Sequence, residues 1–289
     1  MNDAAGGQTF RIVLWIVAVG FFMQTLDSTI VNTALPSMAR ALGESPLSMH
    51  SVVIAYSLTM AMLIPASGWL ADRFGTRKVY LAAIALFTLG SVACAVSTSL
   101  TQLVLSRIVQ GAGGAMLLPV GRLVVLRNVP RDQFLPAMSF VAIPGLIGPL
   151  IGPTLGGWLV QAASWHWIFL INLPVGILGL ALTAIYMPDS RNAGVGRFDI
   201  LGYLMLSVGM VALSFSLDGL TDLGFERATV LVLLVFAFAL VVGYFLHAQR
   251  RPDPLFPLTL FRIHTYTVGL LGNLFARIGS GAMPFLIPL

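Results

Sequence analysis

The chain has 289 residues, of which 57% are hydrophobic and only 9% are charged, and its mean hydropathy is +0.92. An average soluble domain carries roughly 25% charged residues, so this composition excludes an ordinary soluble enzyme and a disordered chain, and the sixteen Lys and Arg residues form no basic block that would bind nucleic acid. The single cysteine, Cys94, excludes an intramolecular disulfide and a Cys-rich metal site, which leaves an integral membrane protein.

Eight stretches are long and apolar enough to cross a bilayer as helices, which takes about 20 residues each. A ninth begins near 265 and meets the end of the chain. Alternating strand-type hydrophobicity is absent, so the pattern predicts an all-α membrane protein rather than a barrel. The first stretch is too long for a signal peptide and is expected to stay as a helix. The eight stretches lie at roughly 12–33, 48–68, 79–97, 101–123, 135–160, 166–187, 200–217 and 228–248.

The basic residues predict which side each loop faces, because cytoplasmic loops collect Lys and Arg. If the N-terminus is cytoplasmic, twelve of the sixteen Lys and Arg residues fall on the cytoplasmic side. Arg40 and Arg227 fall outside, and Arg107 and Arg277 fall within spans. The loops are short, and the longer cytoplasmic connections, 188–199 and 249–264, have the Pro, Gly and Arg content of linkers.

The first span carries an acidic residue, Asp27, in an otherwise apolar run. Gln24, Ser28 and Val31 share its helical face because they follow the spacing of a helix. A charge buried in a span is costly and therefore indicates function. A carboxyl on an inward face can be protonated or ionised according to its surroundings, as a proton-coupled machine requires. The alternative is a helix-packing Asp satisfied by Thr or backbone neighbours.

Two arginines also fall within predicted spans. Arg107 lies on the same side of its helix as Gln110, Gly111 and Gly114. Because arginine stays charged, it must face a cavity, a carboxylate or backbone carbonyls; a structural clamp on a neighbouring helix is the alternative. Arg277 lies in the ninth stretch, and its role stays open. The further candidates for the wall of a polar cavity are Gln24, Asn32, Gln110 and Arg277.

The fifth span is dense in glycine and proline. Gly145, Gly148, Gly152 and Gly156 form one smooth helix face, which lets another helix approach closely in a membrane. Prolines at 144, 149 and 153 favour kinks. The face either packs against a neighbour or belongs to a helix that bends during a conformational cycle, and the two are compatible. The residues selected as an antiporter-type helix are Gly148, Pro149, Gly152, Pro153, Gly156 and Gly157.

A short basic loop joins the second and third spans. Gly75 can adopt a left-handed turn conformation, and Asp72 can cap a helix N-terminus or pair with a guanidinium across the bundle. Composition alone identifies this segment only as a positively charged cytoplasmic loop. The residues selected as a cytoplasmic gating loop are Gly68, Asp72, Arg73, Gly75, Arg77 and Lys78.

With these residues in view, the sequence resembles the major facilitator superfamily. Residues 26–36 match its first-helix signature, 68–81 its cytoplasmic loop, 103–115 its fourth-helix pattern, and 148–159 its antiporter pattern. Thr76 stands where a basic residue is common in the loop. More narrowly, the chain is similar to fourteen-span drug/proton antiporters of the EmrB/QacA type, and its first six spans resemble MdtD-like multidrug transporters. Four motifs in this order are together highly specific.

The resemblance implies a major-facilitator helical bundle. It places an N-terminal six-helix bundle at 1–188, a two-helix insert with cytoplasmic linkers at 189–262, and the first helix of a second bundle at 263–289. The chain would then be cut within a helix and would not transport alone. The resemblance also implies proton coupling by Asp27 and Arg107, and a latch containing Asp72, Arg73 and Arg77 that stabilises the outward-facing state.

The function expected is proton-coupled export of small molecules by alternating access between two bundles. No catalytic residue, metal or cofactor is expected, because the proton gradient would drive transport. The expected partners are the lipid bilayer, a small-molecule substrate and protons, with no nucleic acid and no obligate protein partner. The expected location is the bacterial inner membrane, with a cytoplasmic N-terminus. The alternatives are export of an organic anion or metal chelate, and a non-transporting membrane sensor.

The sequence lacks the motifs of ATP-driven transporters, retinal proteins and zinc proteases of the membrane. Lys78, the one lysine, is followed by Val79, so the sequence has no phosphate-binding loop for ATP and no lysine for a retinal Schiff base within a helix. The four histidines are too far apart for a zinc protease motif. An intramembrane serine protease would need a Ser–His pair at one depth, whereas His166 and His247 lie near span ends, so it stays a minor alternative.

Overall fold

The computed structural model describes the backbone of residues 2–192, 194–221 and 226–286, and the side chains of residues 10–192, 194–217 and 226–276. Within these ranges every regular element is a helix. Among the described residues, eight helices or continuous helix pairs are long and apolar enough to cross a membrane. The eight spans predicted from hydropathy are therefore confirmed, and the protein is an all-α, multi-span membrane protein.

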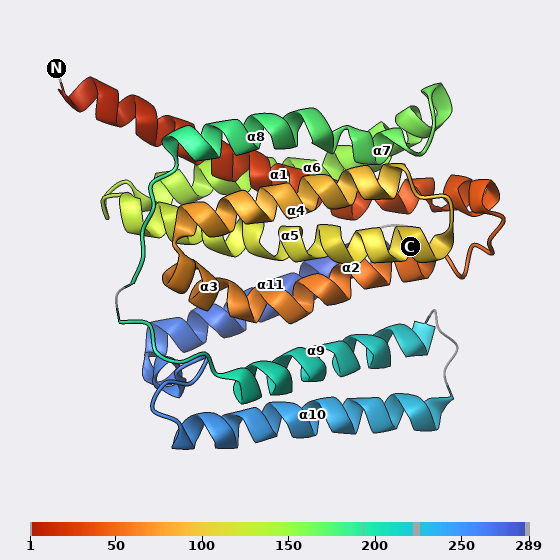
Figure 1. Ribbon diagram of the computed structural model, residues 1–289. Coiled ribbons are helices and arrows are strands. Elements are labelled where there is room, and N and C mark those ends of the chain that lie inside the picture. The colour runs from red at the N-terminus through yellow and green to blue at the C-terminus, as the bar shows by residue number, and fades with distance from the viewer. Residues whose placement is uncertain (1, 193, 222–225, 287–289) are drawn as a thin grey trace.

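The first six spans pack together as a bundle (Figure 1). The first helix packs along α6, α4 packs along α5, and α2 packs on the other side of α5, while α8 lies against α4 and α1. The bundle consists of α1 (Asn2–Leu42), α2 (His50–Leu63), η1 (Ile64–Ala66), α3 (Ser67–Phe74), α4 (Thr76–Ala95), α5 (Leu100–Asn128), α6 (Phe134–Ala162), α7 (Trp167–Leu170) and α8 (Asn172–Tyr186).

The next two spans, α9 (Ile200–Thr221) and α10 (Arg227–Arg250), form a pair that contacts the bundle through α2. The hydroxyl of Ser207 on α9 donates to the carbonyl of Met62 at 3.0 Å, at the end of α2. A short turn, η2 (Leu258–Arg262), leads into α11 (His264–Leu286). The described side chains of α11 are mostly exposed, including Phe275 at 70%.

Three spans end later than predicted: the first at Leu42, the second at Phe74 rather than near 68, and the fourth at Asn128 rather than near 123. The first helix continues to Leu42 rather than ending near residue 33, because Pro36 lies inside it and removes only one backbone donor, which a membrane helix tolerates. The second span is divided by η1, where Pro65 lacks an N–H and the helix tightens before α3 continues. By contrast, α6 runs through its three prolines without interruption.

The basic residues near the helix ends lie at two opposite ends of the molecule, most of them at one end. The start of α1, the end of α3, the start of α4, the end of α5 and the end of α8 all lie at the left in Figure 1, which we call the basic end. Arg40 and Arg227 belong to the opposite end. The segments at the basic end carry Arg11, Arg73, Arg77, Lys78, Arg122, Arg127, Arg131, Arg191, Arg197, Arg250, Arg251 and Arg262.

Candidate functional site

A polar network separates two apolar cores inside the bundle. One core includes residues 13–23 of α1 and 116–125 of α5, and the other includes residues 30–39 of α1 together with Leu103 of α5. Asp27 and Arg107 lie between these two cores along their helices. Since Asp27 is 17 residues from Phe10 and 15 from Leu42, the two ends of the first span, it lies near the middle of the membrane.

The centre of the network is an ion pair between α1 and α5. The Nη1 of Arg107 donates to Oδ2 of Asp27 at 2.6 Å, and both side chains are at most 1% exposed. Two neutral amides complete the carboxylate's surroundings: the side-chain nitrogens of Gln110 and Asn172 donate to its Oδ1 at 2.8 and 3.4 Å. Asp27 is therefore an acceptor for donors from α5 and α8 at the same time.

A second ring of contacts connects these helices through α4. The hydroxyl of Ser91 accepts from the side-chain amides of Gln110 at 3.1 Å and Asn172 at 3.0 Å, and it donates to the carbonyl of Phe169 at 3.0 Å. All of these polar side chains are buried. The network thus links α1, α4, α5 and α8. A change in the charge of Asp27 therefore alters hydrogen bonds that join these four helices.

Arg107 also has partners other than Asp27. Its Nη1 donates to Oε1 of Gln110 at 2.8 Å, its Nε donates to the carbonyl of Val52 at 3.4 Å, and its guanidinium lies 4.0 Å from the centre of the Tyr56 ring. The Tyr56 hydroxyl is buried and has no hydrogen-bond partner among the described residues. These contacts would hold the guanidinium on α2 and α5 if the carboxylate were neutralised.

Small residues bring the helices close enough for these contacts. A Cβ at Gly90 would overlap the backbone of Gln110, and one at Gly113 would overlap the backbone of Phe87 and Ala83. The helices α4 and α5 therefore touch backbone to backbone at Ala83, Phe87 and Gly90, in the two turns that lead up to Ser91. This close approach places the Ser91 hydroxyl within reach of Gln110.

The glycine face predicted in the fifth span is present and lies against α1. Gly145, Gly148, Gly152 and Gly156 are buried, and a Cβ at each would overlap Phe21, Thr25, Thr29 and Thr33 in that order. Pro149 and Pro153 point away and are exposed, and Gly157 has open space around it. The face is a packing surface that fixes α1, and with it Asp27, against α6.

Not every candidate for a polar cavity joins the network. Gln24 is buried but faces α2, where its amide nitrogen lies 4.0 Å from the sulfur of Met60, and its Oε1 has no partner among the described residues. Asn32 and Ser28 are exposed, so the polar face predicted around Asp27 is only partly inward. Gln110 is in the network, whereas the side chain of Arg277 lies outside the described residues.

The gating-loop residues gather at the basic end around the turn between α3 and α4. Asp72 forms an ion pair with Arg127 at the end of α5. Gly75 has a φ of +97°, and a Cβ there would overlap the Asp189 carboxylate. The backbone N–H of Arg77 donates to Oδ1 of Asp189 at 3.3 Å, so the segment after α8 packs on this turn. Gly68, Arg73 and Lys78 are exposed.

Another acidic residue, Asp199, which the sequence analysis did not single out, connects α9 with α10. The Oδ1 of Asp199 accepts from the N–H of Gly202 at 3.1 Å, caps α9, and lies 2.9 Å from Nε2 of His247 and 3.4 Å from Nε of Arg251. Burial raises the pKa of Asp199, but the hydrogen bond from His247, the Gly202 N–H and the nearby charges outweigh it and hold the pKa below its usual value.

The polar partners that sequence reasoning missed are neutral. Ser91, Asn172 and Tyr56 carry no charge and lie in apolar helices, and their position beside Asp27 and Arg107 is what identifies them. Among the described residues, no group of three or more His, Cys, Asp or Glu side chains could hold a metal ion.

Comparison with known families gives one match that covers most of the chain. The model of the Major Facilitator Superfamily matches residues 17–287. This range includes all the residues of the network and of the gating loop.

Among curated proteins, the chain is similar to several from Pectobacterium, Serratia and Salmonella, each named "Putative multidrug resistance protein MdtD". It is 58% identical to that of Pectobacterium carotovorum subsp. carotovorum over 289 residues, which is 100% of this chain and 61% of the relative. It is 57% identical to that of Serratia proteamaculans over 276 residues, 96% of this chain and 58% of the relative. The chain thus spans about 60% of the length of these curated relatives.

Solved structures share the fold at low sequence identity. The crystal structure of a peptide transporter POT in complex with sulfate matches 84% of this chain and 52% of its own, with a TM-score of 0.59 and 18% identity. That of the human organic anion transporter MFSD10 (TETRAN) matches 72% of this chain and 56% of its own, with a TM-score of 0.55 and 16% identity.

Proposed function

The chain belongs to the Major Facilitator Superfamily, and we propose that it acts in the proton-coupled export of small molecules from the bacterial cytoplasm across the inner membrane, as a transporter and not as an enzyme. The relatives' name, a multidrug resistance protein, supports drugs or similar small molecules as the substrate class. The concentration of Lys and Arg at the basic end supports a cytoplasmic position for that end and for the N-terminus.

The observation that carries this proposal is the buried ion pair of Asp27 and Arg107. A carboxylate and a guanidinium at 2.6 Å, both out of contact with solvent, hold each other's charge in the middle of a membrane protein. Taking either charge away leaves the other buried without a counter-ion, which is strongly unfavourable. A proton arriving at Asp27 therefore changes the free energy of the contact between α1 and α5.

The proposed coupling follows from the two sets of partners. Protonation of Asp27 removes the negative charge, so Arg107 keeps only Gln110, the Val52 carbonyl and the Tyr56 ring. The contact between α1 and α5 weakens while Arg107 stays on α2 and α5, and this biases the bundle toward inward-facing substrate loading. Release of the proton to the cytoplasm restores the pair. No cofactor is needed, because the proton gradient supplies the free energy.

The proposed organisation follows the same division as the spans. Residues 1–188 act as the six-helix bundle that holds the proton site, residues 189–262 as a two-helix insert with its linkers, and residues 263–289 as the first helix of the second bundle. Asp72, Arg73 and Arg77 act as the cytoplasmic latch, in which the pair of Asp72 with Arg127 ties α3 to α5. The residues of the α6 glycine face keep α1 aligned during this cycle.

The experiment is gradient-driven efflux from everted membrane vesicles. Because the chain spans 61% of the Pectobacterium relative, transport is measured with the chain fused to the part of that relative that it does not cover. We expect proton-gradient-dependent transport of a lipophilic cationic dye, and a matching signal from a pH probe. Asp27→Asn abolishes both while the protein still inserts, and Arg107→Lys impairs them because lysine lacks the planar guanidinium.

Asp199→Asn serves as the matched control, since it removes a buried carboxylate at the basic end instead of mid-membrane. It should leave the dependence on the proton gradient intact. Unaltered efflux from the Asp27→Asn variant would refute the coupling role, and absence of any efflux or pH response with the unsubstituted fusion would refute the transporter assignment.

A further inference from the structure

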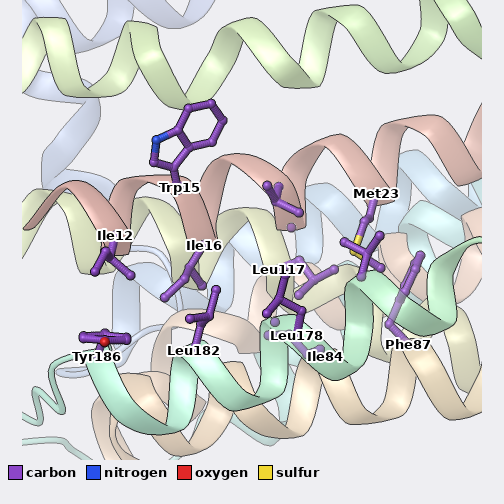
Figure 2. A pocket seen from close by; sticks show the side chains of 14 residues that line it. Ile12, Trp15, Ile16, Met23, Ile84, Phe87, Leu117, Leu178, Leu182 and Tyr186 are labelled. Carbon is purple, nitrogen blue, oxygen red and sulfur yellow. The ribbon is translucent and has the colours of Figure 1, made fainter. Parts of the chain in front are cut away.

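An apolar crevice runs along the outside of the bundle between α1 and α8, with α4 and α5 as its floor. Its volume is about 260 Å³, and its wall is almost entirely hydrocarbon. Figure 2 shows Ile12 and Tyr186 at one end and Met23 and Phe87 at the other. Trp15 and Leu178, which line it, are 55% and 58% exposed, so the crevice opens onto the outer surface of the bundle.

The dimensions of the crevice match a lipid chain. Residues 12–23 of α1 cover about 16 Å at 1.5 Å per residue, which is about half of the roughly 30 Å hydrocarbon core of a bilayer. The long axis follows the helices and therefore lies parallel to the acyl chains of one leaflet. The far end is closed by Met23 and Phe87, each one helical turn before Asp27 and Ser91.

Charge and aromatic residues at the open end indicate which lipid fits. Arg11, next to Ile12, is exposed at the basic end and lines a second groove, between α1 and α6, that shares Trp15 with the crevice. Trp15 and Tyr186 are amphipathic aromatics of the kind that lie at the headgroup level. A basic residue at this depth attracts an anionic headgroup. A zwitterionic headgroup would gain less from it.

We propose that the α1–α8 crevice binds one acyl chain of an anionic phospholipid from the leaflet at the basic end, with its headgroup at Arg11. The bound chain fills the gap between α1 and α8 and packs on Met23 and Phe87. These two side chains separate the lipid from the Asp27 network. The site does not depend on the transport activity proposed above, because it is defined by the first bundle alone.

The test is lipid retention by the purified chain in native mass spectrometry. Phosphatidylglycerol and phosphatidylcholine with identical acyl chains are added in turn, and the lipid-bound fraction is measured. We expect about fivefold stronger retention of phosphatidylglycerol, the effect of one basic residue near an anionic lipid. Arg11→Gln should bring the two lipids to equal retention, whereas the matched change at the opposite end, Arg227→Gln, should not.

The acyl-chain part of the proposal is tested by filling the crevice. Gly179→Leu projects a side chain into it, since a Cβ at Gly179 lies 3.6 Å from Ile84 in ordinary contact. Retention should fall about tenfold or more, because each excluded methylene group loses its burial. Gly243→Leu is the matched control on α10, where the nearest atom is 3.9 Å from the added Cβ. Leu178→Trp blocks the mouth from the surface and covers the case in which Gly179→Leu does not fold.

Two results would overturn the proposal. Equal retention by the crevice variants and the Gly243→Leu control would mean that lipid does not enter the crevice. Equal retention of both lipids by the unsubstituted chain, with both lost on crevice filling, would mean that the crevice takes any apolar chain or molecule and that the anionic headgroup plays no part.

Discussion

Two arginines of α5 each form an ion pair with an aspartate of another helix, one pair in buried and the other in exposed surroundings. Arg107 pairs with Asp27 in the middle of the bundle, where the two side chains are 1% and 0% exposed. Arg127 pairs with Asp72 at the basic end, where they are 26% and 27% exposed. Water and salt screen the second pair, whereas the first has only protein dipoles around it. We propose that this difference lets the first pair act as a protonation switch, whereas the second is a weak, exposed tie between α3 and α5.

The largest effect is expected when the buried pair is broken. Asp27→Asn leaves Arg107 charged and buried without an anion, so unfolding in detergent should be easier by about 3–5 kcal/mol. The double variant Asp27→Asn with Arg107→Gln should recover part of this loss, because no unpaired charge is left. Thermal and denaturant unfolding measure both. A loss below about 1 kcal/mol for the single variant would put this pair in the same class as the exposed one.

The next effect tests whether close helix packing sets the position of Asp27. Gly148→Val introduces a Cβ that would lie 2.8 Å from the backbone nitrogen of Leu26, so α1 must move, at a cost of about 1–3 kcal/mol. The matched control is Gly157→Ala on the same helix, which has nothing within 4 Å of the added Cβ. It should be neutral or stabilise the helix by up to about 1 kcal/mol. Equal unfolding temperatures for the two variants would contradict the packing role.

A smaller, pH-dependent effect is expected at Asp199, which is buried like Asp27 but lies at the basic end. Because the folded state holds its pKa below the usual value of 3.8, the carboxylate stabilises the fold above that pH and loses this contribution as the pH falls through the lower, folded-state pKa. Asp199→Asn should cost about 1–2 kcal/mol at neutral pH through the lost hydrogen bonds.

Unfolding of the Asp199→Asn variant and the unsubstituted chain is compared from neutral pH down to about pH 3. The gap between them should narrow only at the acidic end of this range. A gap that stays constant, or that widens as the pH falls, would contradict the linkage.

The smallest effect is expected at the exposed pair. Arg127→Gln should change the free energy of unfolding by less than about 1 kcal/mol, and the change should shrink further at high salt. Its effect should instead appear as faster proteolysis or hydrogen exchange at the turn between α3 and α4, because Asp72 no longer ties that turn to α5. A loss as large as that of Asp27→Asn would remove the contrast between the two pairs.

The sequence predicts the residues of the site best where a charged residue interrupts an apolar span. Asp27 and Arg107 stand out because ionisable groups are rare within spans, and Gln110 because it lies on the same side of its helix as Arg107; the structure brings these three together. Ser91 and Asn172 were missed because which face of a helix turns inward is set by packing between helices. The glycines at 90 and 113 that bring α4 and α5 together act through tertiary contact, which no local pattern reports.

Two predictions about the first span were wrong, namely the inward position of Asn32 and the residue at which the helix ends. Asn32 was selected for its polarity, yet it lies five residues after Asp27 and therefore on another side of the helix, where it is exposed. The end of the first span, expected near residue 33, was placed too early, because the helix continues to Leu42 through Pro36, and a proline near the end of a long membrane helix can remain inside it. The eight spans themselves needed only hydropathy, since burying a backbone in lipid leaves few alternatives to a helix.

The most direct test of the central claim is whether Asp27 is the group that takes up the proton. Infrared difference spectra of the purified protein, recorded as the pH is lowered, report the protonated carboxyl group in its own band. We expect a band that is present in the unsubstituted protein and in Asp199→Asn, and that is absent in Asp27→Asn. Identical spectra for the unsubstituted protein and Asp27→Asn would contradict the account.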